Sequence, residues 1–397
     1  MRQGTIWFSG IILLVVIYLL SVPALAHVPV FGGGGKSPET AIRIEDPSKS
    51  RVLYGQLAPG DLRYYSFKME KGERIVLGPI IPVEQGNEGF IPNLIFIGPG
   101  LVDEGKLPET LEVPEGYGAK VLSYSLPESP VYEGFTPSVF YSLDKLDIKA
   151  PESGIYYAAV GEIREASMRK GEDAIQEKGL QEKGLQEKDL QEKDLQEKGL
   201  QEKDLQEKDL QKREIMKEGN YWTVGNYGLV IGYRESFTLK EWISIPLNQI
   251  KVYRWEGQSL LLIFTPLALT LAAGLLAIFF KRESVAEFNP ARLSGILAGL
   301  FFLGTGASYT FQMLISLSKS SYSSEIFITL ILILVSIGLG IIAIVLCIKD
   351  ENYGTGSTRK RIYFSCLGLT GLLFWAGWFI GSLLAFEAAV LPWKRKG

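Results

Sequence analysis

The apolar residues of this chain are distributed very unevenly, and this distribution constrains the fold more than any motif does. Residues 258–392 contain four apolar runs separated by short charged loops, whereas residues from about 27 to 250 are polar, rich in tyrosine and strand-like. Each run is long enough, at about 1.5 Å per helical residue, to cross a hydrocarbon core of about 30 Å. The pattern predicts an all-β domain followed by an α-helical membrane domain of four transmembrane helices.

Loop charges predict the orientation of these helices. The expected spans are Gln258–Phe280, Leu293–Leu317, Ile326–Ile348 and Ile362–Phe386. The loops 281–292 and 349–361 carry seven Lys and Arg residues, whereas the loop 319–325 carries only Lys319, so the two basic loops should face the cytoplasm. We therefore expect a multi-pass plasma-membrane protein with a large extracellular N-terminal domain. The basic tail 393–397 conflicts with this topology, because a fourth span would place it outside.

The N-terminus has the pattern of a secretory signal peptide over residues 1–26. Arg2 precedes an apolar run, Ile11–Leu20, and the small-x-small site Ala24–Ala26 follows. An uncleaved anchor is the alternative, because Ile6–Ala26 is just long enough to span a bilayer. We expect residues 27–39 to be a flexible leader. Its run Gly32–Ser37 superficially resembles a phosphate-binding loop, but the pattern requires glycine at position 30, where the chain has valine.

Short β-rich segments alternate with Gly and Pro turns between residues 40 and 233. They are rich in Val, Ile, Tyr and Phe, and the clearest are 51–54, 63–67, 74–77, 93–97, 154–160 and 227–231. This spacing predicts an antiparallel sandwich or barrel. Because side chains alternate along a strand, the pairs Tyr64-Tyr65 and Tyr156-Tyr157 should each place one ring in the core and one on a sheet face. A stacking platform for sugars is the alternative reading of these pairs.

Several of these segments resemble the bacterial pre-peptidase C-terminal (PPC) domain family. The resemblance is carried by the string YGQLAPGDLRYYSF at 54–67 and by the segments 71–75, 93–100, 153–157 and 226–229. It departs from the family at Arg63, where a second Asp is usual, and in the longer segment 101–148. The resemblance implies a jelly-roll-like sandwich without catalytic activity, often one that binds polymers or assists a neighbouring domain.

Residues 176–210 are seven copies of Gln-Glu-Lys-(Gly/Asp)-Leu. Leucine at every fifth residue advances about 140° per copy on a helix, so no apolar stripe forms and a coiled coil is excluded. The repeat separates the segment ending at Val160 from the segment around Tyr227. We expect a low-complexity insertion in a finished fold. It is either a duplication without a role, or a flexible spacer or interaction loop.

Residues 234–257 are expected to form an interfacial juxtamembrane segment, since aromatic residues mix there with charges. The membrane-interface candidates are Trp242, Tyr253 and Trp255. Within the spans, small residues at i, i+4 spacing predict close helix packing at Gly295, Gly299, Ser336, Gly340, Gly377 and Gly381. Gln312 is the one strongly polar side chain expected inside a span. The absence of ionisable residues from the expected spans argues against a pump or an ion-coupled transporter.

The residue inventory argues against an enzyme. A Ser/His/Asp site needs an imidazole, and His27 is the only histidine; both cysteines, Cys347 and Cys366, lie in apolar runs. We therefore expect no catalytic residues, no cofactor and no metal, with His27 as an N-terminal copper ligand the one remote alternative. The formal charge of −3, without a basic block, gives no nucleic-acid signal.

Two main functional hypotheses follow, and the sequence leaves the oligomeric state open. The first is a non-enzymatic cell-surface protein whose exterior sandwich binds a polymer, a wall component or a neighbouring protein. The second is an accessory subunit of a membrane complex for transport or surface assembly, in which the four spans dock a partner and the sandwich caps it. Four spans exceed what anchoring requires, which favours the second. A membrane-tethered hydrolase is a weaker third. Membrane lipid is an expected partner in each.

Overall fold

The computed structural model describes residues 27–108, 111–161, 224–280, 289–348 and 356–393. The predicted signal peptide, the pentapeptide repeat and residues 394–397 of the basic tail lie outside these residues. The chain divides into two compact units, a β-rich unit of residues 30–127 and 142–233 and a mainly helical unit of residues 1–29, 128–141 and 234–397. The coarse partition into a β-rich region and a helical region is therefore as expected.

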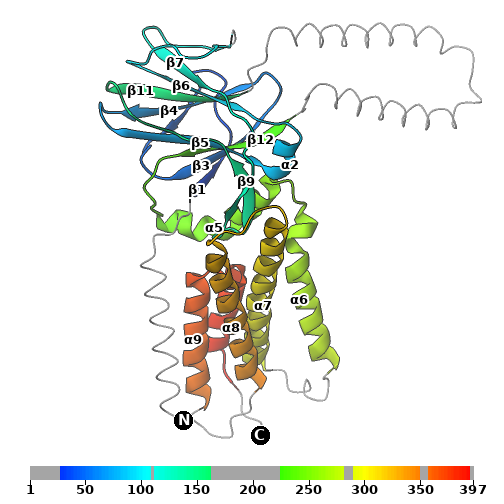
Figure 1. The fold of residues 1–397 in the computed structure, drawn as a ribbon. Coiled ribbons are helices and arrows are strands. Elements are labelled where there is room, and N and C mark those ends of the chain that lie inside the picture. The colour runs from blue at the N-terminus through cyan, green and yellow to red at the C-terminus, as the bar shows by residue number, and fades with distance from the viewer. Residues whose placement is uncertain (1–26, 109–110, 162–223, 281–288, 349–355, 394–397) are drawn as a thin grey trace, which may run out of the picture. The chain divides into compact units, whose positions relative to one another are not determined.

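The β-rich unit is built from two sheets, drawn as two layers in Figure 1. One sheet has the order β1-β3-β12-β5, with β10 also paired to β5; the strands are β1 Val28–Phe31, β3 Arg51–Leu57, β5 Arg74–Pro82, β10 Leu146–Lys149 and β12 Gly225–Ile231. The other has the order β2-β4-β11-β6-β7, formed by Ile42–Ile44, Leu62–Met69, Gly154–Gly161, Asn93–Gly98 and Gly118–Leu122 respectively. β2 pairs in parallel with β4. A short helix, α2 Val83–Asn87, follows β5.

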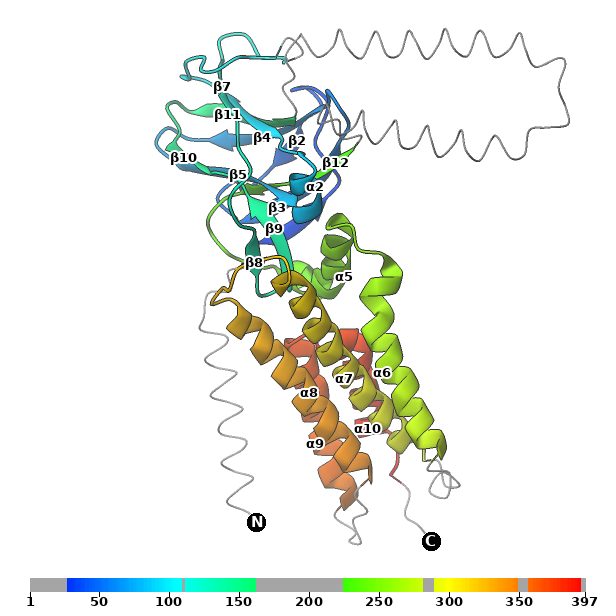
Figure 2. The same cartoon turned by 45° about the vertical axis from the view of Figure 1, so that its right-hand side comes forward.

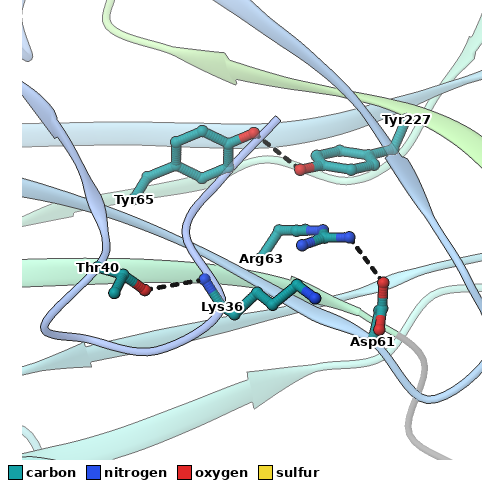
Figure 3. Close-up of polar contacts among 6 residues, drawn as sticks. All are labelled: Lys36, Thr40, Asp61, Arg63, Tyr65 and Tyr227. Atoms are coloured by element: carbon teal, nitrogen blue, oxygen red, sulfur yellow. Dashed lines mark hydrogen bonds and ion pairs between the residues drawn. The ribbon is translucent and has the colours of Figure 1, made fainter. Parts of the chain in front are cut away.

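Each of the six predicted strand segments lies in a strand of this unit, namely β3, β4, β5, β6, β11 and β12. A buried hydroxyl pair, Tyr65 Oη to Tyr227 Oη at 2.8 Å, joins β4 of one sheet to β12 of the other (Figure 3). Burial raises the pKa of Tyr227 to about 12, so this pair stays protonated at physiological pH. The pair supplies a specific polar contact inside an otherwise apolar core.

The outer face of the five-stranded sheet is covered by the segment between β6 and β7. Tyr64 and Tyr65 point to opposite faces, as alternation requires, yet both are nearly fully buried. Tyr64 packs with Ile95 and Ile97 beneath Leu107, Leu111 and Val113, and its hydroxyl accepts a hydrogen bond from the Glu112 amide at 3.2 Å. The long segment that departs from the PPC pattern therefore shields this face from solvent.

The glycine-rich segment before β2 is part of the fold and not a flexible leader. Residues 28–31 form β1, and Gly35 exchanges two backbone hydrogen bonds with Tyr64, at 3.0 and 2.7 Å. A side chain at Gly34 would meet the Tyr64 backbone. The Lys36 amide donates to the Thr40 hydroxyl at 3.1 Å (Figure 3), and the Ser37 amide donates to the same hydroxyl at 3.0 Å. Because these amides are already engaged, this loop is not arranged as a phosphate cradle.

The helical unit contains α5 Leu239–Trp255, α6 Leu260–Phe280, α7 Pro290–Leu317, α8 Ile326–Ile348, α9 Gly356–Leu373, a 3-10 turn η2 Ala376–Phe379, and α10 Ile380–Val390. Among the described residues, α6, α7 and α8 are long and apolar enough to cross a membrane. They match the first three predicted spans. The juxtamembrane segment is an ordered helix, α5, with a complete capping box between Thr238 and Glu241.

A single fourth helix over 362–386 is not present, because the chain breaks after Leu373. Trp375, Gly377, Trp378 and Phe379 all have positive φ angles, between 51° and 73°. Such left-handed backbone ends a right-handed helix and costs about 1–2 kcal/mol per non-glycine residue. The segment therefore forms two helices, α9 and α10, and α10 has 11 residues, too few to cross a bilayer.

Contacts along α9 and α10 show that the two helices run antiparallel. The Phe364 ring stacks on Trp393 at 5.5 Å, a side chain at Gly368 would meet Phe386, and one at Gly371 would meet Ser382. As residue numbers increase along α9, the residue numbers of their contacts near α10 decrease. The end of α10 consequently lies at the same end of the bundle as the start of α9 (Figure 1).

Candidate functional site

A β-hairpin from the β-rich part of the sequence belongs to the helical unit. Its strands are β8 Val131–Glu133 and β9 Ser138–Ser142, paired antiparallel, and residues 128–141 cluster with the helices. Figure 2 shows the hairpin at the ends of α7 and α8. We call residues 131–141, together with the helical residues that they bond, the clasp.

The tip of the hairpin is hydrogen-bonded to the N-terminal end of α8. The Gly134 amide donates to Glu325 Oε2 at 2.9 Å, and the Thr329 hydroxyl donates to the Gly134 carbonyl at 2.6 Å. Since that hydroxyl has given its proton to Gly134, it must accept the 2.7 Å bond from the Tyr132 hydroxyl. Tyr132 and Thr329 are both buried. The result is a directed chain of hydrogen bonds through the clasp.

Gly134 is required by the closeness of this contact. A Cβ atom built there would overlap the backbone carbonyl of Glu325. The obstacle is backbone, which cannot move aside as a flexible side chain can. The base of the hairpin is fixed as well, since the Ser316 hydroxyl donates to the Pro137 carbonyl at 3.2 Å and the Val139 amide donates to Glu256 Oε1 at 2.8 Å. The hairpin therefore bonds α7, α8 and the end of α5.

Glu133 organises the hairpin turn from inside. Its carboxylate accepts the amides of Phe135 and Thr136 at 3.1 and 3.0 Å. Burial, aided by the negative charge of Glu325, raises the pKa of Glu133 to about 8 against the hydrogen bonds from the Phe135 and Thr136 amides, which lower it. This carboxyl is therefore mostly protonated at neutral pH and loses its proton as the pH rises through about 8, which makes the clasp sensitive to pH.

The turn between α9 and η2 lies against the same hairpin. The Trp375 ring meets Phe135 edge-on with centroids 5.1 Å apart and lies 5.2 Å from the Trp242 ring. Trp375 Nε1 donates to the Trp242 carbonyl at 3.0 Å, and the Gly377 amide donates to the Thr305 hydroxyl at 2.8 Å. The bond to Thr305 satisfies a backbone amide where the helix is interrupted, and the bond to Trp242 joins the turn to α5.

A small pocket lies beneath this turn. It is lined by Pro246, Gln249, Tyr253, Ile263, Thr305, Ser308, Tyr309, Gln312, Trp375 and Trp378, and its cavity volume is about 10 Å³. This is room for about one water molecule. Ser308 Oγ and Trp378 Nε1 have no hydrogen-bond partner among the described residues. Gln312 forms a reciprocal amide pair with Gln258, both bonds being 2.9 Å.

The predicted interface residues lie at this end of the helical unit. Tyr253 and Trp255 are buried, and Trp242 is partly buried against Trp375. Their rings therefore pack mainly against protein, and the exposed face of α5 carries other residues. The single histidine, His27, is partly buried immediately before β1.

The residues predicted to mediate helix packing all lie at buried positions or close helix contacts. A side chain at Gly299 would meet the Gly340 carbonyl and one at Gly340 would meet the Gly299 carbonyl, so α7 and α8 approach closely there. Gly295 faces Cys347 and Phe364, and Gly377 and Gly381 face Phe302. Ser336 is fully buried in α8. Gly377 has a second role that its spacing did not reveal, since its φ of +73° helps form the break.

Sequence reasoning missed the clasp and the break, although both left signals. The pair Trp375 and Trp378 flanks a glycine near the middle of the predicted span, whereas tryptophan usually lies at membrane interfaces. The hairpin left a weaker signal, an alternating segment around Gly134 within the stretch that is longer than the PPC pattern allows.

Comparisons with known proteins add little. No protein-family model and no curated protein matches the chain. Among solved structures, PliG of Salmonella Typhimurium, a periplasmic inhibitor of g-type lysozyme, is similar at 16% identity over 31% of this chain and 98% of that chain, with a TM-score of 0.12. At that TM-score the likeness carries no argument about fold or function, and the PPC resemblance remains a prediction.

The described residues of this site offer hydrogen bonds and aromatic contacts. No group of three or more His, Cys, Asp or Glu side chains among them could hold a metal ion. The carboxylates of Glu133, Glu256 and Glu325 are each occupied by backbone amides of the hairpin. The arrangement is suited to holding the hairpin against the helix ends and to responding to protonation.

Proposed function

We propose that this chain is a non-enzymatic accessory subunit of a membrane complex, in which the helical unit docks a partner and the clasp holds a hairpin from the β-rich part of the sequence against the helices of that unit. The observation that carries this proposal is the clasp itself. A domain that only needs tethering requires one flexible linker, whereas here a hairpin from the β-rich region bonds to three helices. The chain also passes between the two units at 29/30, 127/128, 141/142 and 233/234.

The partner-docking face is assigned to α6. Of its residues, only Ile263 is buried, whereas α7 and α8 bury side chains along their whole length. α6 packs on α7 through small residues, since Gly274 faces Leu300 and Gly304 faces Leu267. The rest of its apolar surface, including Leu269 and Leu276, is exposed. A transmembrane helix of a partner would cover this surface with the packing that membrane helices use.

In this proposal the protein lies in the plasma membrane with the β-rich unit outside the cell. The basic loops between α6 and α7 and between α8 and α9 support that orientation. The antiparallel course of α9 and α10 supports it too, because the end of α10 lies at the same end of the bundle as the start of α9, which follows one of those loops in the sequence. With this course, the charges of the basic tail no longer argue against the proposed orientation.

A second candidate function is a surface module that binds a polymer. It is favoured by one observation, the partly exposed pair Tyr117 and Tyr157, whose ring centroids are 6.3 Å apart. Ring pairs of this kind can stack on sugars. The covered face around Tyr64 weakens this candidate, because the widest aromatic surface of the sheet is not available to a ligand.

Site-specific photo-crosslinking in native membranes tests the proposal. A photoreactive residue at Leu269 on α6 should give one defined protein adduct, identified by mass spectrometry and present in stoichiometric amount. The matched control is Leu334 on α8, which is similarly exposed and should crosslink mainly to lipid. Equal yields of lipid adduct from both positions, with no protein adduct, would contradict the proposal.

The polymer-binding candidate predicts a different result. The full-length protein in nanodiscs would sediment with purified cell-wall polysaccharide, and the double substitution Tyr117→Ala with Tyr157→Ala would abolish that binding. Retention by the polysaccharide, together with the absence of a protein adduct at Leu269, would favour the surface module over the accessory subunit.

A further inference from the structure

The outward face of α5 presents a stripe of large aliphatic side chains. Leu239, Ile243 and Leu247 are spaced four residues apart and are 74%, 49% and 63% exposed. At about 100° per residue these three positions fall within about 80° of one another on the helix surface. Three large aliphatic residues at one turn of spacing form a continuous strip along the helix.

The same face carries three cations. Lys240, Lys251 and Arg254 are exposed, and together with the aliphatic strip they lie within an arc of about 120°. The acidic residues of this helix region, Glu241 and Glu256, project elsewhere: Glu241 closes the capping box, and Glu256 bonds the hairpin. The outward face is therefore both apolar and positively charged.

The inward face of α5 is fixed by specific contacts, so the helix cannot rotate to bury the aliphatic strip. Gln249 Nε2 donates to the Tyr309 hydroxyl at 3.2 Å, and the Trp242 carbonyl accepts from Trp375. Ile245, Val252, Tyr253 and Trp255 are buried on this side. One side of α5 is thus packed against the protein, whereas no described residue covers the opposite side.

The position of α5 in the chain places it at the membrane surface. It ends at Trp255, and the membrane-spanning α6 begins at Leu260. Leu260 and Leu261 at the top of α6 are also exposed, which continues the apolar surface from one helix to the next. Aliphatic side chains flanked by Lys and Arg are the pattern of a helix that lies in the headgroup layer of a bilayer.

We infer that this face of α5 binds anionic phospholipid headgroups, with Leu239, Ile243 and Leu247 inserted below the phosphates that Lys240, Lys251 and Arg254 contact. The lipid surface that this face binds is distinct from the α6 face assigned to a protein partner. Trp242 of α5 contacts the broken turn, and Glu256, immediately after α5, contacts the hairpin, so lipid binding here stabilises the clasp.

Reconstitution of the full-length protein into nanodiscs tests the charge requirement. Discs of phosphatidylcholine alone are compared with discs containing phosphatidylglycerol, and the thermal unfolding midpoint is measured. The wild type should unfold several degrees higher in the anionic discs, and the triple variant Lys240→Gln, Lys251→Gln and Arg254→Gln should lose that difference. The control triple Arg43→Gln, Lys68→Gln and Lys149→Gln, in the β-rich unit, should keep it.

The depth of the face is tested independently. The variant Leu247→Cys, in a background with Cys347→Ala and Cys366→Ala, is labelled with an environment-sensitive fluorophore. Its emission should be blue-shifted in nanodiscs and quenched by lipids brominated near the headgroup, whereas a label at Ser321→Cys should remain water-like. A water-like label at Leu247 together with an unfolding midpoint that is the same in both discs would overturn the inference. Burial of the label only in native membranes would instead indicate a protein partner at this face.

Discussion

At the residue scale, the clasp depends on the absence of a side chain at position 134. Gly134→Ala places a methyl group against the Glu325 carbonyl, so we expect a loss of about 1–3 kcal/mol, typical of overpacking. The loss should appear as a lower unfolding midpoint in nanodiscs and as faster chymotrypsin cleavage near Phe135.

The matched control for this variant is Gly338→Ala in α8, where a Cβ atom meets nothing within 4 Å. It should be neutral or stabilise by up to about 1 kcal/mol, because alanine is the better helix former. If both alanine variants change the unfolding midpoint equally, the hairpin does not approach α8 as closely as the structure shows.

The hydrogen-bond chain through Tyr132 and Thr329 should show energetic coupling. Tyr132→Phe and Thr329→Val each remove a buried hydroxyl, and each should cost about 1 kcal/mol. Since the two hydroxyls bond each other, the double variant should cost less than the sum of the singles by about 0.5–1 kcal/mol. Unfolding of all four proteins in the same nanodiscs measures this coupling. Strict additivity would contradict the bond.

Glu133 should make the stability of the clasp depend on pH. Its folded-state pKa is raised to about 8, so the folded protein keeps a proton that the unfolded chain has already lost above its ordinary carboxyl pKa. Stability is therefore highest at low pH, declines as pH rises toward about 8, and levels off above that value. Glu133→Gln should flatten this decline. Chymotrypsin sensitivity of the hairpin between pH 5 and pH 9 provides the measurement, and a decline that survives the substitution would assign it to another group.

At the element scale, the broken helix changes which side of the membrane the end of the chain reaches. Because α9 and α10 run antiparallel, Thr358→Cys and Pro392→Cys should both react with a membrane-impermeant maleimide from one side of sealed vesicles. Ser321→Cys, between α7 and α8, should react from the other side. The native cysteines are replaced in each case. Labelling of positions 358 and 392 from opposite sides would instead indicate that this segment spans the membrane a fourth time.

Elements whose pattern is set by local sequence were predictable, and those set by tertiary contact were not. The strands around Tyr65, Phe96 and Tyr157 and the helix 326–348 follow from alternation and from apolar length. The break at Trp375 replaces a favourable helix with strained backbone, and contacts with Trp242, Phe135 and Thr305 compensate for it. No pattern within a window of the sequence contains those partners.

The candidate site was predictable only in part for the same reason. Trp242 and Gln312 were singled out for their residue type and depth, and both lie at the site. Glu133, Glu325 and Thr329 were not, because ordinary polar residues acquire their role when sequence positions almost 200 residues apart meet. A single sequence does not show which distant residues will be in contact in the fold.

At the scale of the whole molecule, the pentapeptide repeat should be dispensable for folding. The segment between β11, which ends at Gly161, and β12, which begins at Gly225, connects the two sheets. Removing residues 176–210 leaves 14 residues before the deletion and 14 after it, counted from 162–175 and 211–224. Because closure entropy changes slowly with length, the unfolding midpoint should change by less than about 2 °C. A large fall would show that the repeat packs on the fold.

The hairpin also determines how this protein can be divided experimentally. A secreted fragment ending at Tyr233 would carry residues 128–141 away from the helices that surround them, leaving Tyr132 and the Glu133 carboxyl without their native setting. Such a fragment would be prone to self-association through that tip, and its binding behaviour would describe an artificial surface. Replacing the tip with a short polar turn is the appropriate design for a water-soluble version, and the lost hairpin could then be supplied in trans as a peptide.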